Sequence, residues 1–130
     1  MYTDGGARGN PGPAGCAALI FDNNNNLVNF TAEYLDHATN NFAEYHALLI
    51  GLKLAQKNSI NILTCKLDSE LVVKQMNGEY KVKDVQIIEF HKKINKYIKT
   101  FDSLRFEYIP RHENIHADKL VNLILDVKSI

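Results

Sequence analysis

Residues 42–58, FAEYHALLIGLKLAQKN, are the stretch from which the fold can best be worked out. Apolar residues recur here at helical spacing and make one wide face, formed by Ala43, Ala47, Ile50 and Leu54 with Leu48 and Leu49 beside them. Capping residues come just before, at 39–41, and Asn41 and Glu44 have the spacing of a capping box. The stretch therefore predicts a helix that lies deep in the core and ends at Asn58-Ser59.

The segment before this helix predicts an antiparallel meander of three strands. Residues 1–8 are too short to judge by periodicity, but they lead into a turn-rich segment, Gly9-Asn10-Pro11-Gly12-Pro13. Residues 14–22 (AGCAALIFD) are typical of a buried strand. After a polar turn at 23–26, residues 27–34 alternate loosely, as a further strand would.

After the helix, strands and helices alternate. Residues 60–67 (INILTCKL) predict a strand, and 69–77 predict a short helix stopped by Gly78. Three more elements follow: a helix at 85–100, a strand at 104–109 ended by Pro110, and a helix at about 114–127. The order βββαβααβα predicts an α/β fold in which later strands add in parallel and helices cover the sheet.

The size and composition predict one domain over residues 1–130. Hydrophobic residues make up 45%, as in ordinary globular proteins, and no apolar run approaches the roughly 18 residues of a membrane helix. The first residues, Met1 to Gly5, do not resemble a signal peptide, so a cytoplasmic location is expected. Cys16 and Cys65 lie in apolar stretches and are expected to be buried free thiols.

The net charge is zero, with 15 basic and 15 acidic residues, which argues against a generic basic nucleic-acid binder. The distribution is uneven: residues 1–40 carry a net charge of −3 and residues 74–99 a net charge of +4. Such asymmetry is expected if metal and phosphate meet different patches. A solvated lysine-rich helix face is the simpler explanation when charge is considered alone.

Four carboxylates lie where predicted elements begin or end: Asp4, Glu44, Asp68 and Asp118. Taken singly, the helix dipole explains Glu44 and Asp118 as acids in a first turn, and Asp68 could be a helix N-cap. As a set they would repel one another at roughly 4 kcal/mol per close pair at an effective dielectric near 20. A fold would tolerate such a cluster only if cations neutralised it.

Two divalent metal ions would provide that neutralisation. Hard oxygen ligands in this number suit Mg²⁺ or Mn²⁺ rather than zinc. A pair of such ions is a common means of cutting phosphodiesters, because one can activate water and the other can stabilise the departing oxygen. If folding brings the four carboxylates together, they could therefore hold a two-metal site.

The glycine-rich stretch at residues 5–15, GGARGNPGPAG, needs a separate explanation. It has neither the spacing of a P-loop nor GxGxxG before a helix, so nucleotide binding of those kinds is not expected. A tight hairpin whose backbone approaches a ligand is the better interpretation.

Four segments, in order along the chain, together resemble type 1 ribonuclease H. They are Asp4-Gly5-Gly6 followed by GNPGPAG at 9–15, Thr39-Asn40-Asn41-Phe42-Ala43-Glu44, Leu67-Asp68-Ser69, and Arg111-x-x-Asn114-x-x-Ala117-Asp118. The resemblance covers essentially the whole chain. It implies the ribonuclease H-like fold, a five-stranded mixed sheet of order 3-2-1-4-5 flanked by helices, which agrees with the predicted element order.

The resemblance also implies an activity and its residues. The chain would be a monomeric endonuclease that hydrolyses the RNA strand of RNA/DNA hybrids and leaves 5′-phosphate and 3′-hydroxyl ends. Asp4, Glu44, Asp68 and Asp118 would be catalytic and would hold two Mg²⁺ or Mn²⁺ ions. The substrate contacts implied for the hybrid are Gly5, Asn10, Asn40 and Glu70 on the RNA strand, Asn41 on the DNA strand, and Arg111 on a phosphate.

Two features depart from some members of that family. A lysine-rich helical protrusion is missing, because only EYKVKD at 79–84 fills its place. Hybrid binding should then be weaker and more sensitive to salt, with lysines 81, 83, 92, 93 and 96 substituting in part. No histidine aligns with a catalytic one before the last aspartate; His112 and His116 are nearby, and an exposed loop histidine is the simpler interpretation of His112.

Two alternatives to hybrid cleavage remain at this point. One is a non-catalytic module that binds hybrids or duplexes, and the presence of all four carboxylates argues against it. The other is a DNA-acting nuclease of the same superfamily, such as a resolvase-like enzyme. The Gly-Asn-Pro-Gly segment at 9–12 and the Thr-Asn-Asn segment at 39–41 favour recognition of a hybrid.

Overall fold

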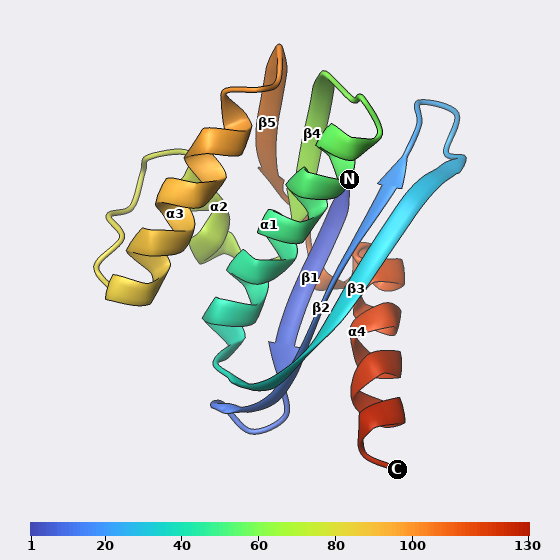
Figure 1. Ribbon diagram of the computed structural model, residues 1–130, viewed down its shortest axis with the longest axis vertical. Coiled ribbons are helices and arrows are strands. Elements are labelled where there is room, and N and C mark those ends of the chain that lie inside the picture. Colours follow the sequence, from blue (N-terminus) through green and yellow to red (C-terminus); the bar gives the residue numbers. More distant parts are fainter.

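The computed structural model describes residues 1–130 and places five strands in one mixed sheet, in the order β3-β2-β1-β4-β5 (Figure 1). β1 (Tyr2–Ala7), β2 (Gly12–Phe21) and β3 (Leu27–Ala38) pair antiparallel. β4 (Ile62–Leu67) pairs parallel with β1, and β5 (Ser103–Tyr108) pairs parallel with β4. The predicted meander, the parallel additions and the strand order 3-2-1-4-5 are all confirmed.

Helices cover both faces of the sheet. α1 (Asn40–Lys57), α2 (Glu70–Met76) and α3 (Val85–Ile98) lie on one face, and α4 (Ile115–Lys128) crosses the other (Figure 1). A single 3₁₀ turn, Arg111–Glu113, joins β5 to α4 and was not predicted. No helix is both long enough and apolar enough to cross a membrane.

The main hydrophobic core lies between the sheet and the helices α1, α2 and α3, and α3 lies beside α1. Ten residues of α1 are buried, which confirms the wide apolar face. The rings of Phe42 and Phe90 meet edge to face at 4.8 Å where α1 contacts α3. On the opposite face, Val121 and Leu125 of α4 pack on Ala17 of β2. Helices therefore pack on both faces of β1 and β2.

Several predicted details at element ends are wrong. The N-cap of α1 is Thr39, whose hydroxyl accepts a hydrogen bond from the Phe42 amide, so the capping box of Asn41 and Glu44 does not form. Glu44 consequently lies in the second turn rather than the first. Asp68 is not a cap, because the hydroxyl of Ser69 caps α2. β3 continues past residue 34 to Ala38, since its far end pairs with Gly12 at the start of β2.

Gly5 sets how closely α1 approaches β1. A Cβ placed there would lie 2.3 Å from the carbonyl carbon of Ala43 and 2.5 Å from the amide nitrogen of Glu44. Both neighbours are backbone atoms, which cannot move aside as a flexible side chain can. A Cβ on Gly6 would meet nothing within 4 Å.

This contrast predicts opposite outcomes for two adjacent substitutions. Gly5→Ala should lower the free energy of unfolding by about 1–3 kcal/mol, because α1 must shift away from the sheet. Gly6→Ala, the matched control, should change it by less than about 0.5 kcal/mol. Urea unfolding of both variants measures the difference, and equal effects would show that α1 does not rest on Gly5.

Candidate active site

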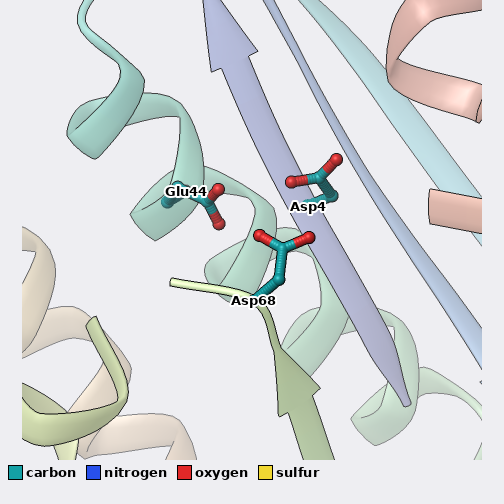
Figure 2. A group of neighbouring side chains, drawn as sticks. All are labelled: Asp4, Glu44 and Asp68. Carbon is teal, nitrogen blue, oxygen red and sulfur yellow. The ribbon is translucent and has the colours of Figure 1, made fainter. Parts of the chain in front are cut away.

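Three carboxylates from three different elements meet beside β1 (Figure 2). Asp4 lies within β1 and is 7% exposed, Asp68 directly follows β4, and Glu44 projects from α1. Each offers one oxygen, and these oxygens all lie within 4.8 Å of one another. The parallel pairing of β1 and β4 brings the two aspartates together, and the close approach at Gly5 brings Glu44 over them.

Asp118 lies near this cluster but outside it. It sits in the first turn of α4, as predicted, and lines the same cavity of about 450 Å³ as Asp4, Glu44 and Asp68. It does not belong to the group of mutually close oxygens, and one of its oxygens lies 3.6 Å from the guanidinium of Arg111. The structure therefore gathers three of the four expected carboxylates tightly and places the fourth at the rim.

The cluster strongly disfavours full ionisation. Burial, followed by repulsion from Asp68, raises the pKa of Asp4 from its ordinary 3.8 to about 7. Burial and then the charges of Asp4 and Asp68 raise the pKa of Glu44 well above its usual value. Burial also raises the pKa of Asp68, against the opposing effects of the Asn114 hydrogen bond and of Arg111. Full ionisation at neutral pH therefore requires added positive charge.

The residues present fit a bound metal ion. Glu44 Oε2 is buried and has no hydrogen-bond partner, which is unfavourable for a carboxylate oxygen unless a cation contacts it. No lysine or arginine nitrogen lies within 4.0 Å of the Asp4, Glu44 or Asp68 carboxylates. A dense set of carboxylate oxygens is the donor set that hard divalent cations prefer. The cluster can therefore hold metal.

Asn114 holds Asp68 of the cluster in place, a role that its local sequence did not predict. Its side chain is 1% exposed, and Nδ2 donates to the Thr3 carbonyl at 2.8 Å and to Asp68 Oδ2 at 3.1 Å. It thereby joins β1, the end of β4 and the start of α4. The available signal was its place in Arg111-x-x-Asn114-x-x-Ala117-Asp118, but an asparagine before a helix is normally interpreted as a cap. Here its side chain makes no capping bond.

Replacing Asn114 should therefore loosen the cluster. Asn114→Ala leaves a buried carbonyl and a carboxylate oxygen unpaired, so we expect a loss of about 1–3 kcal/mol in the free energy of unfolding and weaker Mg²⁺ binding. The matched control is Asn95→Ala, since Asn95 is exposed and its side chain bonds only to His91. Urea unfolding and calorimetric Mg²⁺ titration measure both effects. Equal behaviour of the two variants would contradict a fixing role for Asn114.

The expected substrate residues divide into two groups. Gly5, Asn40 and Arg111 line the cavity, whereas Asn10, Asn41 and Glu70 do not. Glu70 instead forms an ion pair with Lys74 at 2.9 Å. Arg111 and His112 are both exposed, in the 3₁₀ turn beside Asp118.

Two asparagines connect the glycine-rich loop to α1. Asn10 Oδ1 accepts a hydrogen bond from the Asn40 amide at 3.0 Å, and Asn40 Oδ1 accepts one from the Ala7 amide at 2.8 Å. Both carbonyl oxygens are therefore used within the protein. The side-chain NH₂ groups of these exposed residues remain available as donors to a ligand.

The basic protrusion is absent, as predicted. Residues 77–84 connect α2 to α3 without forming a helix. Gln75 holds this short connection, because its Nε2 donates to the Lys81 carbonyl at 3.4 Å and its Oε1 accepts from the buried Tyr45 hydroxyl at 2.6 Å.

Comparison with known proteins gives one consistent result. Residues 2–124 match the model of the reverse transcriptase-like family. The chain is 36% identical over 127 residues to the bifunctional protein Rv2228c of Mycobacterium tuberculosis, covering 97% of this chain and 35% of that protein. It is 33% identical over 125 residues to ribonuclease HI of Halobacterium salinarum, covering 96% of this chain and 63% of the relative. The chain thus spans about a third to two thirds of the length of these curated relatives.

Solved structures agree closely. The N-terminal RNase H domain of Rv2228c, solved as a fusion with maltose binding protein, superposes with a TM-score of 0.94 at 35% identity, covering 98% of this chain and 92% of that one. LC11-RNase H1, solved in complex with an RNA/DNA hybrid, superposes with a TM-score of 0.93 at 40% identity, covering 99% and 97%. The chain therefore belongs to the reverse transcriptase-like family, as a ribonuclease H-like domain close to the type 1 ribonucleases H.

Proposed function

We propose that residues 1–130 form a single catalytic domain, active as a monomer, that hydrolyses the RNA strand of RNA/DNA hybrids. The observation that carries this proposal is the meeting of the Asp4, Glu44 and Asp68 oxygens within 4.8 Å, in a cavity that also contains Asp118. Family membership supports it, as does the name of the Halobacterium relative, ribonuclease HI. That LC11-RNase H1 was solved with a hybrid supports the choice of substrate.

In this proposal Asp4, Glu44 and Asp68 hold two Mg²⁺ or Mn²⁺ ions, with Asp118 completing the set from the rim. When bound, the ions supply a nucleophilic water at neutral pH and stabilise charge on the leaving oxygen. Asn114 keeps Asp68 directed into the cluster. Hydrolysis adds water across the P–O3′ bond, so the products carry a 5′-phosphate and a 3′-hydroxyl.

Selection of the RNA strand would rest on groups that can reach a 2′-hydroxyl, the group that distinguishes RNA from DNA. Asn40 lines the cavity, and its free NH₂ group can donate to that hydroxyl. Gly5 has no side chain, so its backbone lines the cavity directly beside Asp4. Asn10 would contribute by holding Asn40 and with its own NH₂ group, and Asn41, Glu70 and Arg111 would make contacts further along the hybrid.

The decisive experiment uses three labelled duplexes of one sequence: RNA/DNA, RNA/RNA and DNA/DNA. Each is incubated with the protein and Mg²⁺, Mn²⁺ or EDTA. The proposal requires cleavage of the RNA strand in the hybrid, dependent on a divalent cation. Binding without cleavage would instead indicate a non-catalytic hybrid-binding module, and cleavage of DNA/DNA would indicate a DNA-acting nuclease of the superfamily.

A further inference from the structure

Arg8 lies in the same cavity as the carboxylates, and the proposed mechanism does not use it. Asp4 and Arg8 are four residues apart along β1 and its immediate continuation, which separates them by about 13 Å. Arg8 lines the cavity together with Asn40 and Asn122. The cavity therefore has an anionic part around Asp4 and a cationic group further along the same strand.

Residues of α4 fix the orientation of the Arg8 guanidinium. Its Nη2 donates to Asp126 Oδ1 at 2.5 Å and lies 3.4 Å from Asn122 Oδ1. All of its hydrogen bonds use Nη2, so the Nε and Nη1 donors remain unengaged. The side chain is 44% exposed, which leaves these donors open to a ligand.

An arginine held in this way suits a phosphate better than a purely structural role. Exposed ion pairs such as that of Arg8 with Asp126 contribute little to stability, so the pair alone does not explain why the guanidinium lies in the cavity. A pre-positioned guanidinium can donate two parallel hydrogen bonds to phosphate oxygens. Only one other cationic residue, Arg111, lines the cavity, and it lies beside Asp118.

We propose that Arg8 binds a phosphate of the strand being cut, in addition to the phosphate that is cut at the carboxylates. This second phosphate lies a few linkages from the cut, and Arg8 contacts one of its non-bridging oxygens. The inference rests on the proposed function for the identity of that strand. Its physical role is to fix the register of the strand, so that a particular phosphodiester lies over the carboxylates. Arg8 contacts no reacting atom and contributes to binding rather than to the chemical step.

The test is a cycle of protein and substrate changes. Each hybrid has one cleavable site. The strand that is cut carries a single neutral methylphosphonate linkage between deoxynucleotides, placed one to six linkages from the cut on either side. The matched substrates carry the ordinary phosphate at the same deoxynucleotides. With wild-type protein, one position should raise KM roughly 10- to 100-fold with little change in kcat, as expected for loss of a charge-assisted hydrogen bond. With Arg8→Gln, the methylphosphonate at that position should raise KM almost no further.

Matched variants separate this role from general effects of charge and stability. Arg105→Gln removes the same side chain from an exposed position on β5 outside the cavity and should leave the methylphosphonate profile unchanged. Arg8→Lys keeps the charge without the planar fork and should give an intermediate KM. Asp126→Asn removes the main tether but keeps Arg8, so its effect should be smaller than that of Arg8→Gln.

The same cycle is also measured as hybrid affinity in an Asp68→Asn background, so the result does not depend on cleavage. If the methylphosphonate raises KM by the same factor in the wild type and in Arg8→Gln at every linkage, the inference is overturned. Failure of the wild type to cut any unmodified hybrid would instead overturn the proposed function, and the affinity cycle would still report whether Arg8 contacts a phosphate.

Discussion

Asp68→Asn is expected to reduce Mg²⁺-dependent cleavage of an RNA/DNA hybrid by at least about 1,000-fold without unfolding the protein. Removing one carboxylate from a metal-binding cluster costs several kcal/mol of transition-state stabilisation, and each 1.4 kcal/mol is a factor of ten in rate. The fold should survive, because Asn retains an oxygen that can accept the hydrogen bond from Asn114. Asp68 is also only half-buried, unlike Asp4 and Glu44.

The measurement is single-turnover cleavage, with thermal unfolding as the check on folding. Asp102→Asn is the matched control, because Asp102 is exposed and lies just before β5, away from the cavity. Its rate should equal that of the wild type. Cleavage by Asp68→Asn within tenfold of the wild-type rate would exclude a catalytic role for this cluster.

The metal-free protein should become less stable as the pH rises from about 4 to 7, and Asp4→Asn should abolish much of that loss. Asp4 has an ordinary pKa of 3.8 and a folded-state pKa of about 7, so the folded state holds its proton more tightly than the unfolded state. Above pH 3.8 the unfolded chain gains from ionising, and folding becomes less favourable until the folded group also ionises near pH 7. The difference corresponds to at most about 4 kcal/mol.

Thermal unfolding in EDTA, at several pH values between about 4.5 and 7.5, measures this effect. Asp4→Asn should melt higher than the wild type, and the gap should widen with pH, because the amide cannot ionise. Mg²⁺ at 100 times its dissociation constant should stabilise the wild type by about 2.7 kcal/mol and the variant by less. A gap that stays constant with pH would show that Asp4 is not perturbed by its neighbours.

The parts of the fold that the sequence predicts well are those with long periodic signals. The apolar face of residues 42–58, the alternation before and after it and the turn residues at 23–26 and Gly78 all correspond to observed elements. Cys16 and Cys65 are buried free thiols, as predicted. The errors lie at the ends of elements, as at the far end of β3 and in the 3₁₀ turn, and at helix caps, since Thr39, Asn41, Ser69 and Asp68 all have side chains that can cap a helix. Only the three-dimensional geometry decides between them.

The site was harder to predict where it depends on contacts between distant residues. Gly5, Asp4 and Glu44 carry local signals, but the hydrogen bonds of Asn114 and Arg8 join residues more than 100 positions apart. Local sequence spacing cannot predict hydrogen bonds between residues so far apart. The position of Asp118 at the rim likewise depends on how α4 docks, and the amphipathic pattern of that helix does not specify its docking.

The hydrogen bond from Asn114 to Thr3 also bears on biosynthesis. It joins residues 111 positions apart, so one end of the carboxylate cluster is made early in translation and its support is made late. A nascent chain in which α4 has not yet emerged from the ribosome has β1 and α1 available but lacks both Asn114 and Asp118. The carboxylate cluster therefore lacks its support and its fourth acid until α4 has been made and has docked on the sheet.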